Sequence, residues 1–421
     1  MNPSIRRFVA AMFGAILLQP ILVVGALSPA LAGGLYVSEY ATSDMGAAGS
    51  GILAGGSGAG AAAMVNPAAT TLADSHNLHL GLAPGFSSAH FDADGDPRNT
   101  GGNGGEQGGF VPLLSTSYVH KLSDRFRLGF GTFSISGAAL DPEDSWAGRN
   151  QVTKIQLFTL TFFPNVGVRV TDWLSLGVGP AITYGRLDWK LRVGPAVNEL
   201  NVKLDDLDDW GVGAVVGVLL EPHEDVRLGI VYQSKTNLTL RGDSRSSGPV
   251  IGDPVDTAVD LDLPQAVRAD LMWRAMDRLS FSVGGAWENW GELEDTDVRV
   301  GSLADRVRLG FQDTYKVRAG VHYQLTDKTM IQTGVSFDSA AIPTQDRTAA
   351  LPIDKQWRWG IGGTYDAGEG REIGYAFQYA NLGDAKIDSP SLKGEYDRNE
   401  LFFFLVSINF SKLPWDGMAT F

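Results

Sequence analysis

The sequence contains no cysteine, which removes disulfide frameworks, thiolate zinc sites and cysteine nucleophiles from consideration. It also lacks an excess of basic residues, since 34 lysines and arginines stand against 48 aspartates and glutamates, giving a formal net charge of −14. This acidic balance argues against nucleic acid as a partner. Beyond residue 32 no run of about 18 strongly apolar residues could form a spanning helix. If the chain crosses a membrane, it must therefore do so as a closed β-barrel.

The N-terminus has the layout of a secretory signal. Arg6 and Arg7 precede a long apolar stretch that ends in Ala-Leu-Ala at residues 30–32. A charged region, an apolar region and a small-residue cleavage site in this order are typical of a cleaved signal peptide. We therefore expect residues 1–32 to be a signal peptide and the mature chain to begin at Gly33, with a retained signal anchor as the alternative.

From about residue 76 onward, segments with period-two alternation are joined by short and long connections in turn. The short connections are residues 123–124, 171–172, 221–225, 275–277, 326–327 and 366–370. The long polar connections are residues 92–108, 137–153, 193–209, 242–257, 289–313, 339–352 and 381–394. Tight periplasmic turns alternating with long extracellular loops are typical of outer-membrane barrels. Six turns and seven loops predict an all-β fold with fourteen antiparallel transmembrane strands over residues 76–411 and both termini on the periplasmic side.

The inside of this barrel is expected to be partly apolar. The segment 155–163 carries apolar residues on both faces, which suggests either a greasy compartment or contact with an internal plug. Residues 33–75 are rich in glycine and alanine and show no strand period, so we place them in the lumen as a small N-terminal hatch. Residues 412–421 are expected to be a C-terminal extension, so that either Phe410 or Phe421 is the barrel-assembly signal.

Three stretches of the sequence carry a family resemblance. They are residues 33–40 followed by Asn66, Pro67 and Ala68; residues 261–264; and residues 310–318 leading through 337–339 to 343–352. In these stretches the chain resembles the long-chain fatty-acid transporter family of outer-membrane proteins, which also includes aromatic-hydrocarbon uptake channels (FadL/TodX-like). The resemblance extends from Gly33 to about Phe410.

The resemblance implies a route for a hydrophobic ligand. Such a ligand would be captured near the extracellular loops, bind in an apolar lumenal pocket near Leu35 and Tyr36, and leave sideways into the membrane at a kinked third strand. The kink would fall on small residues that permit a bulge, with a plain barrel corner as the alternative reading. These residues are Gly129, Gly131, Ser134 and Gly137.

The resemblance also implies that family members which transport fatty acids bind the carboxylate with two basic side chains. The nearest candidates here are Lys190 with Arg192, and Arg306 with Arg308. Each lies one position from the matching residue, which in a strand reverses the face. The sequence therefore favours uptake of long-chain fatty acids, and of aromatic or alkane hydrocarbons if the pocket lacks these charges.

Other chemistry is weakly indicated. Residues 92–96 resemble the start of a calcium loop, but the twelfth position is Asn103 in place of the required glutamate, so no metal or cofactor is expected. The sequence alone shows no serine or aspartate paired with one of the six histidines on the outer face or rim of the barrel, and we do not expect an enzyme. A barrel hydrolase and a general porin stay as alternatives of another class. The expected surroundings are outer-membrane lipid and lipopolysaccharide, with the protein as a monomer.

Overall fold

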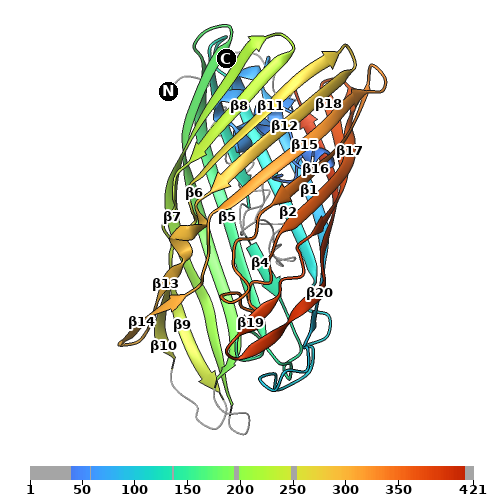
Figure 1. Ribbon diagram of the computed structural model, residues 1–421. Helices are drawn as coiled ribbons and strands as arrows, with labels where there is room; N and C mark the ends of the chain where they lie inside the picture. The colour runs from blue at the N-terminus through green and yellow to red at the C-terminus, as the bar shows by residue number, and fades with distance from the viewer. Residues whose placement is uncertain (1–38, 57, 135–136, 194–198, 248–253, 413–421) are drawn as a thin grey trace.

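The computed structural model describes residues 39–56, 58–134, 137–193, 199–247 and 254–412. Its strands form one closed antiparallel sheet, because β1 (Asn77–Asp92) pairs both with β2 (Phe110–Lys121) and with the last strand, β20 (Leu392–Phe410) (Figure 1). The strands between them are β3 (Phe126–Phe133), β4 (Gly137–Leu140), β5 (Lys154–Arg169), β6 (Leu174–Val193), β7 (Leu200–His223), β8 (Val226–Gln233), β9 (Thr239–Ser247), β10 (Val255–Asp260), β11 (Ala266–Met276), β12 (Leu279–Glu288), β13 (Asp295–Val300), β14 (Leu303–Arg308), β15 (Thr314–Gln324), β16 (Thr329–Asp338), β17 (Gln356–Gly368), β18 (Arg371–Asn381) and β19 (Ile387–Ser389).

The wall of the barrel contains fourteen strands in the described part of the chain, as the alternation of turns and loops predicts. In this count β3 with β4 and β8 with β9 are each one interrupted wall strand. The elements β10, β13, β14 and β19 are short additions. Leu78 pairs with Phe410, so the wall begins and ends at the same end of the barrel. None of the helices among the described residues is long and apolar enough to span a membrane.

The outer face of the wall is apolar and the inner face is buried. Along β6 and β7, exposed residues such as Val178 and Val212 alternate with buried ones, as period-two geometry requires. Exposed tryptophans lie near the ends of the wall strands, for example Trp173 beside the 171–172 turn and Trp357 at the start of β17. An apolar band flanked by aromatic residues is the surface that a bilayer requires of a barrel.

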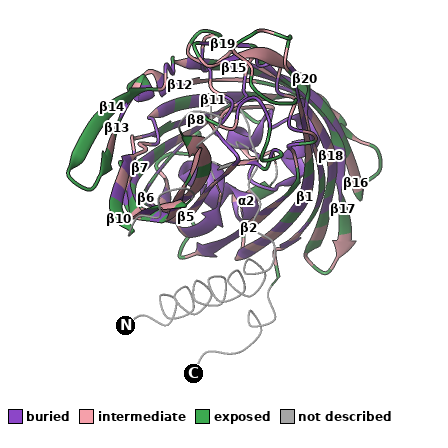
Figure 2. Cartoon of the chain, turned by 90° about the horizontal axis from the view of Figure 1, so that it is seen from below, coloured by how far each residue is buried: buried purple, intermediate pink, exposed green. Residues whose placement is uncertain are grey.

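Residues 39–75, here called the lumenal segment, lie inside the barrel, in blue near the upper end in Figure 1 and within the ring of strands in Figure 2. The segment consists of short helices: η1 (Ser43–Ala47), η2 (Ile52–Ala54), α2 (Gly58–Val65) and η3 (Pro67–Leu72). Glycines on the wall make room for it, because a Cβ on Gly177, Gly217 or Gly229 would overlap this segment. The richness of the chain in glycine thus has a packing cause in the lumen.

The extracellular connections are more ordered than their polar composition predicts. Residues 193–209 were expected to be a loop, yet the paired strands β6 and β7 extend through most of them. The acidic residues there, such as Asp206 and Asp208, lie on a solvated two-stranded extension, so their polarity indicates exposure to water and not a lack of strand structure. Within residues 289–313, the helix η4 (Trp290–Leu293) precedes the β13–β14 hairpin, which projects from the barrel as an exposed arm (Figures 1 and 2).

Candidate functional site in the barrel lumen

Asn66 fastens the middle of the lumenal segment. Its Oδ1 accepts a hydrogen bond from the Ala68 backbone N–H (3.0 Å), which caps η3, and Pro67 occupies the first helical turn where no donor is needed. Its Nδ2 donates to the Leu53 carbonyl (2.8 Å) and to the Val218 carbonyl of β7 (3.2 Å). The Asn-Pro-Ala stretch therefore joins two helices of the segment to the wall.

Buried ion pairs fasten the segment to other strands of the wall. Asp270 of β11 forms a two-point pair with Arg318 of β15 (2.8 and 3.0 Å), and its Oδ2 also accepts from the Leu53 N–H (3.0 Å). Farther along, Arg358 of β17 lies 2.6 Å from the Asp338 carboxylate and 3.9 Å from Glu39 at the start of the segment. Buried charges are stable only when they are paired in this way.

The cations near Glu39 determine the pKa of its carboxyl group. Burial by itself would raise the pKa of this carboxyl. The cations Arg358, Lys316 and Arg318 outweigh burial and hold its pKa below the ordinary value. Glu39 is therefore ionised at neutral pH.

A small cavity lies between the lumenal segment and the part of the wall that runs from β3 to β11. It is lined by Tyr40, Met64 and Val65 of the segment, and by Phe133, Thr161, Phe163, Ala181, Val215, Val231, Gln233 and Arg268 of the wall. Its volume is about 10 Å³, room for about one water molecule, because the segment fills the space. Tyr40 and Phe133 meet edge to face with ring centroids 4.8 Å apart. The lumen is thus occluded at this level.

Arg268 is the charged residue of this cavity. It is buried, and its Nη1 donates to the Tyr40 hydroxyl (3.4 Å) and to Gln233 Oε1 (3.2 Å). Sequence reasoning missed it. The available signal was an arginine at an inward position of a strand whose other face is apolar, between Val267 and Leu271.

The residues predicted to hold a carboxylate do not line this cavity. Arg192, near the outer end of β6, lies 3.6 Å from Glu199 and 3.3 Å from Asp144. Lys190 lies on the same strand extension, opposite Lys203 of β7. The structure places both at the extracellular end of the barrel.

The second predicted pair lies on the β14 strand of the projecting hairpin. Arg306 is bound to Asp295 (3.3 Å), and Arg308 to Glu294 (2.9 Å) and to Asp346 (3.2 Å). Leu35 and Tyr36, predicted beside the ligand pocket, lie outside the described residues.

Of the residues predicted to form a kink, Ser134 and Gly137 lie where the wall strand is interrupted between β3 and β4, whereas Gly129 and Gly131 lie within β3. β3 ends at Phe133 and β4 begins at Gly137, with Ser134 half-buried at the break. β2 pairs with β3 from residue 115 to residue 121, whereas residues 110–114 of β2 pair only with β1 in the described part of the chain. β4 in turn pairs with β5. Gly129 and Gly131 face inward, and a Cβ on either would meet the α2 helix.

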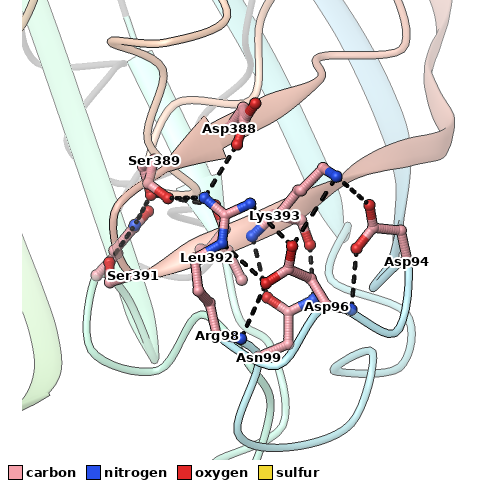
Figure 3. Close-up of polar contacts among 10 residues, drawn as sticks. Asp94, Asp96, Arg98, Asn99, Asp388, Ser389, Ser391, Leu392 and Lys393 are labelled. Atoms are coloured by element: carbon pink, nitrogen blue, oxygen red, sulfur yellow. Dashed lines mark hydrogen bonds and ion pairs between the residues drawn. The ribbon is translucent and has the colours of Figure 1, made fainter.

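Loops at the extracellular end are joined to one another by polar contacts. Arg98 donates hydrogen bonds to Asp96, to Asp388 (3.0 Å) and to the Ser389 carbonyl (2.9 Å) (Figure 3). The Asn99 side-chain amide donates to the Lys393 carbonyl and accepts from the Lys393 backbone N–H. The Arg98 hydrogen bonds hold the pKa of the Asp96 carboxyl well below its ordinary value. Residues 92–96 therefore use their carboxylates to join loops.

Together, these features define a class: an outer-membrane barrel whose lumen is occupied by its own N-terminal segment and whose outer band is apolar. The family model for "Outer membrane protein transport protein (OMPP1/FadL/TodX)" matches residues 23–401, and the chain belongs to this family. It is an outer-membrane transporter of hydrophobic compounds and not an enzyme.

Known proteins agree with this assignment. The chain is 22% identical to the long-chain fatty acid transport protein of Salmonella typhi over 319 residues, covering 68% of this chain and 73% of that protein. A crystal structure of a Pseudomonas aeruginosa FadL homologue has a TM-score of 0.83 at 18% identity, covering 90% of this chain and 100% of that chain. The crystal structure of the Pseudomonas putida toluene transporter TodX has a TM-score of 0.67 at 17% identity, and the match covers 92% of this chain and 99% of that chain. At this identity the two structures establish the fold alone.

Proposed function

We propose that the protein takes up long-chain fatty acids, and that Arg268 holds their carboxylate in the lumen. The supporting observation is a buried guanidinium in a cavity whose other lining is mainly apolar and aromatic. A guanidinium can bind a carboxylate through two parallel hydrogen bonds. The relative from Salmonella typhi is named for long-chain fatty acid transport, which points to the same class of ligand.

In this proposal the lumenal segment acts as the hatch. Tyr40, Met64 and Val65 fill the space beside Arg268, so a fatty acid binds only when these side chains move. The carboxylate would then replace Tyr40 and Gln233 as the partner of Arg268. The acyl chain would lie against Phe163 and its apolar neighbours, because burying each methylene group contributes about 0.8 kcal/mol.

The proposal retains the implied route. The ligand enters past the extracellular loops, passes the hatch and leaves sideways into the membrane through the interrupted part of the wall, which includes the break between β3 and β4. Lateral release has a physical reason, since an insoluble chain that moves from the lumen into lipid is never exposed to water.

Uptake by cells that express the full chain tests the assignment of ligand. We compare the initial uptake rates of radiolabelled palmitate and toluene for the wild type, Arg268→Gln and Arg268→Lys. Arg268→Gln should lower palmitate uptake about tenfold, because a charge-assisted hydrogen bond contributes about 1.5–3 kcal/mol. Toluene uptake should stay unchanged.

The outcomes separate the two classes of ligand. Arg268→Lys should retain part of the palmitate uptake, because a point charge remains without the planar fork. Uptake of toluene in place of palmitate by the wild type would contradict the fatty-acid proposal and favour a neutral hydrocarbon. Val267→Ala, on the outer face of the same strand, is the matched control.

A further inference from the structure

Two prolines stand opposite each other in the middle of the wall. Phe162 of β5 pairs with Ile182 of β6, and Val166 pairs with Val178. This common register places Pro164 directly across from Pro180. Between the two paired points no ladder contact joins β5 and β6 in this described part of the wall.

The prolines give a chemical reason for the break. Proline has no backbone N–H, so neither residue can donate a hydrogen bond to the other. In an antiparallel sheet, residues that face each other as a hydrogen-bonded pair exchange two such bonds, and here both donors are absent. The register is the same on both sides, so the break is not a bulge. It is confined to this pair of strands, because Pro164 remains paired with β3 and Pro180 with β7.

A hollow of about 830 Å³ lies on the outer face at the break and is here called the outer hollow. Its apolar lining includes Leu128, Pro164, Val166, Val178, Pro180 and Val212. The exposed Trp173 lies toward the periplasmic turn. Toward the other end, Trp210 packs against Phe162 and Tyr184 with centroid distances of 5.9 and 5.2 Å. Aromatic residues mark the two membrane interfaces, so the hollow faces the hydrocarbon between them.

The inner side of the same break faces the cavity of Arg268. Phe163 and Ala181, which flank the prolines in sequence, line that cavity. The cavity and the outer hollow are therefore separated by one layer of backbone that lacks ladder bonds. Asn165 connects this layer to the lumenal segment, because its Nδ2 donates to the Ala63 carbonyl of α2 (2.9 Å). Its buried Oδ1 has no hydrogen-bond partner among the described residues.

We propose that the outer hollow is a binding site for the alkyl chain of the transported ligand, reached from the lumen through the break between β5 and β6. The inference rests on the proposed uptake function and adds a site apart from the β3–β4 interruption. In a bilayer, opening a strand pair leaves backbone groups without partners, which costs several kcal/mol per group. That cost is lowest where two donors are already missing. Release of Asn165 from the Ala63 carbonyl would link the passage to movement of the lumenal segment.

A reversible disulfide across the break tests this site, since the chain has no native cysteine. The variant is Pro164→Cys with Pro180→Cys in the full chain, expressed in cells. The control pair is Leu271→Cys with Val283→Cys, which face each other on the outer side of β11 and β12. Uptake of radiolabelled palmitate is measured after oxidation and again after reduction.

Oxidation of the proline-site variant should lower the initial uptake rate roughly tenfold relative to the same variant after reduction, because the crosslink prevents the two strands from separating. The reduced variant should still take up palmitate more slowly than the wild type, since its cysteines restore the two missing backbone donors. Oxidation of the control pair should change nothing. Equal rates for the oxidised and reduced proline-site variant would overturn the proposal and leave the hollow to membrane lipid. Absence of palmitate uptake by the wild type would instead refute the proposed function, and this site with it.

A second variant guards against misfolding. Pro164→Ala with Pro180→Ala restores both donors without a crosslink, and it should lower palmitate uptake while raising the temperature at which the purified barrel unfolds. The two added ladder hydrogen bonds should raise the unfolding temperature, because they stabilise the folded barrel. An unchanged uptake rate in a barrel stabilised in this way would also overturn the proposal.

Discussion

The two sides of the barrel hold the lumenal segment in different ways. On the regular side, made of β11, β12 and β15 to β18, the ladders run for nine to eleven residue pairs. Buried ion pairs such as Asp270 with Arg318 lie behind these ladders. On the interrupted side, made of β2 to β9, the wall is broken between β3 and β4, between β5 and β6, and between β8 and β9. There the segment meets a mainly apolar cavity, and single hydrogen bonds such as those between Asn66 and the Val218 carbonyl and between Asn165 and the Ala63 carbonyl hold it to the wall.

The difference shows how one wall can be both rigid and able to open. Backbone hydrogen bonds and paired charges are directional, so the regular side fixes the position of the segment. Apolar contacts are non-directional and can be remade after a shift. We therefore expect loss of a buried ion pair on the regular side to affect stability first, and changes at the apolar cavity and at the break between β5 and β6 to affect transport first.

The largest effect on stability is expected for Asp270→Ala. The change leaves Arg318 as a buried, unpaired cation and removes the acceptor of the Leu53 N–H, which should cost about 3–5 kcal/mol. This loss of stability is measured as a lower unfolding temperature of the purified barrel in detergent, which is monitored by the mobility of the barrel on gels. Val267→Ala on the lipid face of the same strand is the control, and an unfolding temperature equal to the wild type would show that the regular side does not depend on this ion pair.

Asn66→Ala should have the next largest effect. It removes the cap of η3 and two donors to carbonyls, at a cost of about 1–3 kcal/mol. Asn66→Ser retains an acceptor for the Ala68 N–H and should recover part of the loss. Protease accessibility of the lumenal segment measures the result, and equal protection in all three proteins would contradict the anchoring role.

Acid should loosen the start of the lumenal segment. The pKa of Glu39 is lower in the seated segment than its ordinary value of 4.5. The stabilisation that ionised Glu39 gives to the lumenal segment in its position is therefore complete above the ordinary pKa of a glutamate and is lost as the pH falls through the lowered pKa. Channel conductance measured from pH 7 downward should rise only in the acidic range.

Glu39→Gln serves as the matched variant in that titration. It should seat the segment less firmly at pH 7 and show a smaller acid response, because the titrating group is gone. Asp338 and Asp270 face the same cations. A response identical to the wild type would show that Glu39 is not the group that loosens the segment.

The smallest effect is expected at the extracellular loops. Arg98→Ala removes exposed contacts to Asp96 and Asp388, and exposed ion pairs contribute little to stability. The unfolding temperature should stay within error of the wild type. A change as large as that of Asp270→Ala would mean that the contacts between the extracellular loops contribute as much to the stability of the fold as the ion pair on the regular side.

Much of the wall can be predicted from local sequence, because strand alternation and turn length are properties of neighbouring residues. Pro164 and Pro180 even lie at equal distances from Asp172 in the short turn, and hairpin turns set register. Their opposition can therefore be worked out from the sequence. The loop at residues 193–209 could not be predicted correctly, since polar residues occur both in loops and on solvated strand extensions.

The sequence by itself determined the strand number, the common end of the wall and the resemblance to a transporter family. Tertiary structure decided which charges meet. Arg268 reaches Tyr40 across 228 residues, and Asp270 reaches the Leu53 N–H across 217. Lys190 and Arg306 instead lie at the extracellular end and on the projecting hairpin. The physical reason is that alternation fixes the face of each side chain, whereas the partner of that side chain depends on how the barrel closes around the lumenal segment.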